Sequence, residues 1–224
     1  MKLLTTLVLA LTSACATAGT LELAPNTLYI AGVINQQMPD LADQLLATAA
    51  TQPVVDIVIN SPGGSVMYGF MFINAMDLAR ARGTVVRCTV TNFAASMAFQ
   101  LLAHCSERYA LRYAQLLWHP VRMSGQITLT PALAVVLAED LRRVESTLVD
   151  DLRSAFKTSD KDFWYHYTQE SLLTTDEVLA VAPGYLTVLD DVTGLQAVHQ
   201  IAPFNPFGGE VTGVWYQWFP AGAE

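Results

Sequence analysis

Asn60-Ser61-Pro62-Gly63-Gly64-Ser65 decides the fold, because it closes a short and nearly continuous apolar strand at residues 54–59 with a pair of glycines. A strand of that composition is typical of a parallel sheet that is buried on both faces. The glycine pair leaves an unhindered backbone at the end of the strand, where the carbonyl oxygen of a substrate can approach. Taken alone, the same stretch is compatible with an ordinary turn.

The segments on either side of this turn alternate between strand and helix patterns, which predicts an α/β fold. Apolar runs predict strands at residues 28–34, 54–59, 84–90, 108–110, 115–118 and 185–189. Helical spacing of apolar residues and capping signals predict helices at residues 39–50, 65–82, 96–103, 130–156 and 174–180. The apolar stripe of the long helix at 130–156 is by itself most typical of a place in the core.

Ala94-Ala95-Ser96-Met97-Ala98 lies where the strand at 84–90 gives way to a helix. The alanines before Ser96 permit a tight turn and leave room for a substrate, and the start of a helix presents unpaired N–H groups and a positive dipole end. A serine in this place becomes a nucleophile when a neighbouring base removes its proton. As a single motif, the run is equally compatible with a plain helix N-cap.

His119-Pro120 follows the apolar strand that ends at Trp118, so the imidazole is expected to emerge at the end of that strand. A neutral imidazole is the usual base for a serine nucleophile. The backbone N–H groups of Gly64 and Met97 are the natural donors to an oxyanion. A lone histidine in this place can also be structural, and its order after the glycines and the serine is the argument for His119.

In their order and short spacing, these segments resemble the ClpP family of serine peptidases from about residue 28 to residue 192. The stretches that carry the resemblance are 59–64, 94–98, 108–111 and 119–120. The resemblance implies a ClpP/crotonase-like fold of stacked ββα units, in which the helix at 130–156 projects as a handle and pairs with another subunit. It also implies peptide-bond hydrolysis without a cofactor in a ring-forming homo-oligomer, with Ser96 as nucleophile, His119 as general base, and Gly64 and Met97 as oxyanion hole.

The chain departs from the family pattern at the third member of the triad. The family has an aspartate before a short helix, and Glu170 stands in the corresponding place. A glutamate can orient an imidazole, but its extra methylene group demands a different backbone position. Asp162 is a second candidate, and a Ser–His dyad without an acid is a third interpretation. Asn92 is a further departure, because it stands where the family usually has a glycine.

The first eleven residues combine a basic start at Lys2 with a short apolar run, and Ala16-Thr17-Ala18 supplies the small residues of a signal-peptidase site. We therefore expect a signal peptide at 1–18, a peptidase domain at 19–202 and a tail rich in aromatic residues, glycine and proline at 203–224. The apolar run is too short to span a bilayer. The protein is expected to be periplasmic or secreted, and to contact a membrane only if Cys15 carries a lipid.

The cysteines, the net charge and the histidines bear on whether the protein has a disulfide, a nucleic-acid partner or a metal. Cys88 and Cys105 form an even pair in an exported chain and are candidates for a disulfide, although two separate buried thiols fit the sequence nearly as well. The net charge of −8 argues against nucleic acid as a partner. The four histidines and few cysteines show no metal-ligand spacing, so no metal is expected.

Three functions fit these residues. The first is an exported serine endopeptidase that hydrolyses short peptides or unfolded segments without ATP, since a periplasm or cell exterior has none. The second is a catalytically inactive ClpP-like assembly or binding protein, as the missing aspartate suggests. The third is crotonase-type acyl chemistry, which the expected export disfavours because coenzyme A is an intracellular cofactor.

Overall fold

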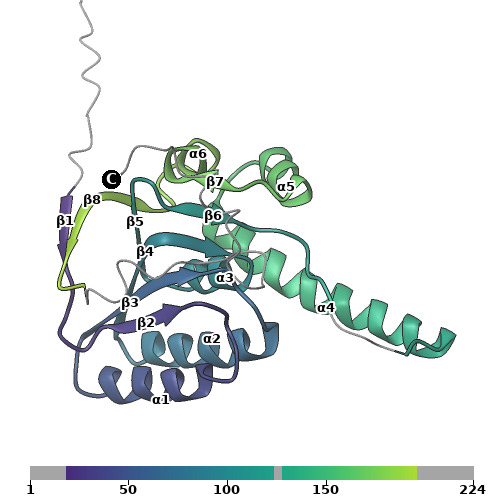
Figure 1. Cartoon of the computed structure of the whole chain (residues 1–224), viewed down its shortest axis with the longest axis horizontal. Helices are drawn as coiled ribbons and strands as arrows, with labels where there is room; N and C mark the ends of the chain where they lie inside the picture. The colour runs from purple at the N-terminus through teal and green to yellow at the C-terminus, as the bar shows by residue number, and fades with distance from the viewer. Residues whose placement is uncertain (1–18, 124–127, 196–224) are drawn as a thin grey trace, which may run out of the picture.

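The computed structural model describes residues 19–123 and 128–195 and shows a mixed α/β fold around one curled sheet (Figure 1). This confirms the predicted fold class. In chain order the elements are β1 (Gly19–Glu22), β2 (Leu28–Ala31), α1 (Met38–Ala49), β3 (Val54–Ser61), α2 (Val66–Ala81), β4 (Val85–Ala95), α3 (Met97–Ala103), β5 (Glu107–Leu111), β6 (Gln115–Leu117), α4 (Pro131–Phe156), α5 (Asp160–Gln169), β7 (Leu173–Thr174), α6 (Thr175–Val181) and β8 (Thr187–Thr193).

The main path of the sheet runs in the order β1-β8-β5-β4-β3-β2, with every neighbouring pair parallel. Strand β6 also pairs with β4 in parallel and joins β7 in an antiparallel ladder. The two central strands are almost wholly buried, which explains their continuous apolar composition. The carboxyl ends of β3, β4 and β6 therefore lie at the same edge, where open α/β sheets bind ligands.

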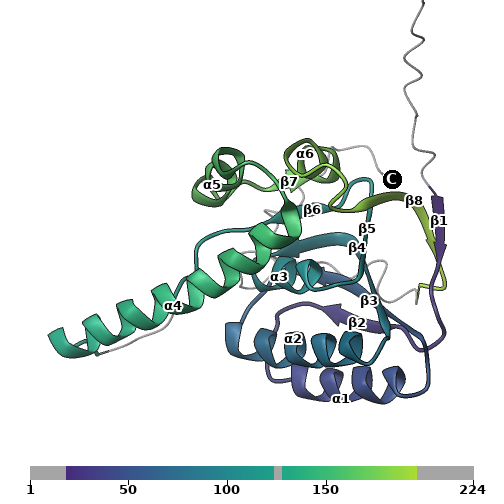
Figure 2. The ribbon, with the colours of Figure 1, turned by 180° about the vertical axis from the view of Figure 1, so that it is seen from behind.

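Helix α4 leaves the body of the molecule as one long projecting helix, which Figures 1 and 2 show from opposite sides. Its C-terminal half packs on the core through Leu148, Leu152 and Phe156. Its N-terminal half exposes Leu133 and Val136, which belong to the predicted apolar stripe. The core interpretation of that stripe is therefore wrong for Leu133 and Val136, and the interface with another subunit stays a prediction.

Three short elements escaped the sequence prediction: β1, α5 and β7. Helix α5 is rich in aromatic residues with modest helix propensity, so its pattern looked irregular. The signal that marks its start is Ser159, whose side chain accepts a hydrogen bond from the backbone N–H of Asp162. Phe163 and Tyr167, one helical turn apart, then bury the inner face of the helix.

Among the helices of residues 19–123 and 128–195, none combines the length and apolar character that crossing a membrane requires. The predicted signal peptide at 1–18 and the tail at 203–224 lie outside the described residues. Both assignments, and the boundary at residue 202, stay predictions.

Candidate active site

The register of the sheet brings the three sequence motifs together. Ser61 on β3 pairs with Ala94 on β4, and Ala94 pairs in turn with Leu116 on β6. The glycine pair, Ser96 and His119 follow these aligned positions by two or three residues each. The backbone N–H of Ser96 also donates to the carbonyl oxygen of Leu117 at 2.9 Å. Segments far apart in the sequence thus end side by side because the strands that carry them are neighbours.

The glycine pair is required by close contacts and by backbone conformation. Gly63 has a φ of +90°, and a Cβ atom added there would lie 2.5 Å from the carbonyl oxygen of Ala95 and 2.7 Å from the Cβ atom of Ser96. Gly64 forms a parallel bridge with Ile34 on its other side. In such a bridge the neighbours of Gly64 make the hydrogen bonds, so its own N–H points away from Ile34.

Ser96 stands at the N-cap position of α3 but does not act as a cap. Its φ of 54° is unfavourable for a residue with a side chain, and its hydroxyl makes no capping hydrogen bond. The structure therefore argues against the N-cap interpretation of the serine. The side chains of Ser65, Thr130 and Ser159, in contrast, all accept a capping bond from their helices. A strained serine with an unused hydroxyl at the edge of a sheet is typical of a nucleophile.

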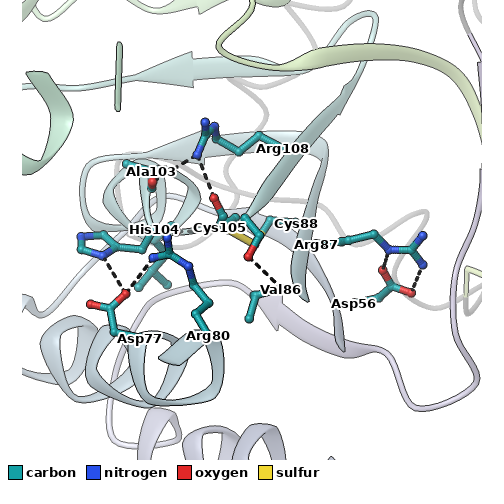
Figure 3. The surroundings of a disulfide bond; sticks show 12 residues. Asp56, Asp77, Arg80, Val86, Arg87, Cys88, Ala103, His104, Cys105 and Arg108 are labelled. Carbon is teal, nitrogen blue, oxygen red and sulfur yellow. Dashed lines mark hydrogen bonds and ion pairs between the residues drawn. A yellow bond between two sulfur atoms is a disulfide. The ribbon is translucent and has the colours of Figure 1, made fainter. Parts of the chain in front are cut away.

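A disulfide joins Cys88 in β4 to Cys105 just after α3, with the two Cα atoms 5.9 Å apart (Figure 3). Ser96 lies between these two residues, at the turn from the strand into the helix. Beside the bridge, the guanidinium of Arg108 donates hydrogen bonds to the carbonyl oxygens of Ala103 and Cys105. These carbonyl groups lie at the C-terminal end of α3, where the helix itself offers no donors. The disulfide closes a loop with the turn at Ser96 inside it and limits how far the strand and the helix can separate.

His119 is held by an aromatic core and by its own backbone neighbour. Trp118, 1% exposed, packs against Phe99 and Phe156 with ring centroids 5.3 and 4.8 Å away, which fixes the end of β6. The Nδ1 atom of His119 lies 2.6 Å from the carbonyl oxygen of Pro120. A carbonyl can only accept, so Nδ1 carries the proton and Nε2 is left as the basic nitrogen.

The pKa of His119 lies below its ordinary value of 6.5, chiefly because burial disfavours the charged imidazolium. The carbonyl of Pro120 opposes this shift, and the positive charge of Arg122 adds to it. The imidazole is therefore neutral at pH 7, which is the state that a general base requires.

A cleft of about 150 Å³ is lined by four of the residues that the sequence predicts for the chemistry, Gly64, Ser96, Met97 and His119, but not by Glu170. Met97 is the first residue of α3, so its N–H is one of the unpaired donors at a helix start. The remaining walls are Val66, Gln100, Trp118, Pro120, Val121, Arg122, Leu148, Val149, Leu152 and Tyr167. Within the described residues, Ser96 and His119 share this cleft without a direct hydrogen bond between them.

Glu170, the predicted third member of the triad, lies at the C-cap of α5 and forms an ion pair with Arg122. The antiparallel ladder of β6 and β7, in which Leu116 pairs with Leu173, ends three residues before His119 and begins three residues after Glu170. In this structure the carboxylate is bound to Arg122, and the Nδ1 atom of His119 faces the Pro120 carbonyl instead.

Asp162, the second candidate for the acid, lies in the first turn of α5 and accepts a hydrogen bond from the hydroxyl of Ser159 at 2.7 Å. It does not line the cleft. Sequence reasoning overlooked Arg122 and the carbonyl of Pro120 as parts of the site. The available signal was a single basic residue in the otherwise uncharged stretch after His119, which indicates a polar contact specific to that loop.

The chain is similar in sequence to proteins of one known family. The sequence profile of the Clp protease family matches residues 21–181. The chain is 31% identical over 127 residues to the ATP-dependent Clp protease proteolytic subunit 1 of Chlamydia muridarum, which is 52% of this chain but only 64% of that protein. It is 29% identical over 163 residues to proteolytic subunit 2 of Mycolicibacterium paratuberculosis, covering 67% of this chain and 79% of that protein. The chain belongs to the Clp protease family, a family of serine peptidases.

Proposed function

We propose that this protein is a serine endopeptidase that hydrolyses short peptides or unfolded segments without ATP. The observation that carries the proposal is that Ser96 and His119 line one cleft together with Gly64 and Met97. Its four parts are a nucleophile, a base and two oxyanion donors, which together make up the machinery of acyl transfer. Membership of the Clp protease family supports the same reaction class.

In the proposed reaction the hydroxyl oxygen of Ser96 attacks the scissile carbonyl carbon while the Nε2 atom of His119 takes the hydroxyl proton. The backbone N–H groups of Gly64 and Met97 stabilise the negative charge on the carbonyl oxygen. His119 then gives the proton to the departing amine, which leaves an acyl-enzyme on Ser96. Water activated by the same imidazole hydrolyses that ester and restores the serine.

We infer that the Pro120 carbonyl orients the imidazole, so that Ser96 and His119 act as a dyad. The support is the 2.6 Å contact between Nδ1 and that carbonyl, which fixes the tautomer that the reaction needs. Glu170 is bound to Arg122 and acts on that side chain instead. A carbonyl lacks the full negative charge of an aspartate, so it stabilises the imidazolium less in the transition state.

Export and assembly complete the proposal. The disulfide between Cys88 and Cys105 supports an oxidising compartment, in line with the signal-peptide pattern at 1–18. Such a compartment supplies no ATP, whereas the named relatives are ATP-dependent. The exposed apolar side chains of Leu133 and Val136 on the projecting part of α4 support association with another copy of the chain.

A nucleotide-free hydrolysis assay tests the proposed function. The protein that begins at Gly19 is expected to cleave a fluorogenic peptide and an unfolded protein such as casein, with no change in rate when ATP is added. Loss of turnover in the His119→Ala variant would assign the hydrolysis to this site. A folded, assembled protein that cleaves neither substrate would favour the second candidate, a catalytically inactive scaffold. The observation that favours this candidate is the ion pair of Glu170 with Arg122.

The pH dependence of kcat/KM follows from the lowered pKa of His119. Activity requires the neutral imidazole, so it falls as the pH drops through that pKa. Because burial and Arg122 lower the pKa, the midpoint of the acid limb is expected below pH 6.5. A pH–rate profile measured with the fluorogenic peptide gives the midpoint, and a value above 6.5 would contradict this account of His119.

A further inference from the structure

The cleft around Ser96 has one formally charged side chain besides the titratable His119, and that side chain is Arg122. The same cleft is lined by apolar residues from α4, among them Leu148 and Leu152. A substrate that fills this space therefore meets both apolar side chains and a guanidinium group. Such an arrangement selects by charge as well as by apolar contact.

Arg122 is both positioned and accessible. One of its terminal nitrogens, Nη2, pairs with the Oε2 atom of Glu170. The side chain of Arg122 is 59% exposed and that of Glu170 is 36% exposed, so a ligand can reach the pair. A guanidinium carries five N–H groups, and within residues 19–123 and 128–195 the Glu170 carboxylate is the one partner that Arg122 has. Donors remain on the guanidinium for a second acceptor.

We propose that Arg122 is a specificity-determining residue that binds a carboxylate of the peptide close to the scissile bond, an inference that rests on the proposed peptidase function. The carboxylate comes either from an acidic side chain or from the C-terminus of a short peptide. Both present the same planar pair of oxygens, which a guanidinium binds through two parallel hydrogen bonds. Glu170 holds the guanidinium in place while its other edge receives the substrate.

The ion pair with Glu170 also limits which anion binds. Arg122 and Glu170 together carry no net charge, so the pair offers directed N–H donors without an excess of positive charge. One carboxylate suits such a site, whereas a phosphate dianion would face the nearby Glu170 carboxylate with two negative charges. The chain as a whole carries a net charge of −8, so long-range attraction adds nothing to the binding of anions. Selection therefore depends on the local contact with Arg122.

The test uses binding rather than turnover, on the Ser96→Ala variant so that no peptide is consumed. Fluorescein-labelled peptides that contain a leucine are compared in pairs by fluorescence anisotropy. The first pair consists of hexapeptides in which a central leucine is followed by aspartate or by asparagine. The second pair consists of shorter peptides that end one residue after the leucine, either as a free acid or as an amide. We expect the carboxylate member of at least one pair to bind roughly tenfold more tightly. The pair that shows the difference identifies the source of the carboxylate.

Arg122→Gln in the same background is expected to remove the preference, so that the carboxylate and uncharged members of each pair bind with equal affinity. The matched control is Arg112→Gln, since Arg112 forms a comparable exposed pair with Asp190 outside the cleft. That variant should keep the full preference. Equal binding of acid and neutral peptides, or a preference that survives Arg122→Gln, would overturn the proposal.

Failure of the proposed function gives a different result. If the wild-type protein cleaves none of the peptides while the Ser96→Ala variant still prefers carboxylates through Arg122, the peptidase proposal falls and the role of Arg122 in binding stands. If the wild-type protein cleaves acid and neutral peptides with equal kcat/KM and binding is equal too, the peptidase stands and the role of Arg122 falls.

Discussion

Ser96→Ala is expected to lower the rate of peptide hydrolysis by about 10⁴-fold or more, to the limit of detection. The substitution removes the only atom that forms a bond with the substrate in the proposed mechanism. It should hardly change the stability of the fold, because the hydroxyl of Ser96 makes no capping hydrogen bond. Chemical denaturation and a steady-state assay on the same preparation measure the two effects.

The control for this prediction is Ser159→Ala, which removes a serine that does cap its helix. That change should cost about 1 kcal/mol of unfolding free energy and leave the rate constant for hydrolysis unchanged. The two variants thus give opposite results: Ser96→Ala loses hydrolysis and keeps its stability, whereas Ser159→Ala loses stability and keeps its hydrolysis rate. Ser96→Ala that unfolds the protein, or that retains a tenth of the activity, would contradict the role given to Ser96.

Gly63→Ala is expected to lower kcat by about 10²-fold or more, because the added methyl group pushes on the turn that holds the nucleophile. A Cβ atom at Gly63 would lie 2.5 Å from the carbonyl oxygen of Ala95, 2.7 Å from the Cβ atom of Ser96 and 2.8 Å from the N atom of Met97. Backbone atoms cannot yield as a flexible side chain does, so Ser96 and one oxyanion donor must move. A displacement of about 1 Å costs roughly that factor in rate.

Gly83→Ala separates this effect from backbone strain. Gly83 has a φ of +93°, close to that of Gly63, but an added Cβ atom there meets nothing within 4 Å. Both variants should lose about 1 kcal/mol or more of stability from the positive φ, and only Gly63→Ala should lose activity in its folded fraction. Equal kcat values for the two variants would show that the close approach of Gly63 to Ser96 does not matter for catalysis.

The sequence predicts the segments of this site better than their contacts. The parallel strands, the glycine pair, Ser96 and His119 follow from local patterns, since buried strands and strand-end turns depend on nearby residues. Arg122 could not be assigned in the same way, because its place depends on an ion pair with a residue on α5. That helix itself escaped prediction, and the family pattern predicted that Glu170 would orient His119 and not that it would pair with Arg122.

Two other features depend on three-dimensional context. The unused hydroxyl and positive φ of Ser96 separate a nucleophile from an N-cap, and a sequence motif alone does not distinguish them. The apolar stripe of α4 is another case, because helical periodicity shows which side chains share a face and not what covers them. The structure leaves Leu133 exposed and buries Leu148 on the same helix.

Reaction of the purified protein with a fluorophosphonate probe, followed by mass-spectrometric mapping of the labelled residue, tests the central claim most directly. A probe of this kind reacts with a serine only when a base and an oxyanion hole activate its hydroxyl. The account predicts a single adduct on Ser96 that is lost in the His119→Ala variant. A folded protein that takes no label at Ser96, or takes it equally without His119, would contradict the claim that this cleft is a working active site.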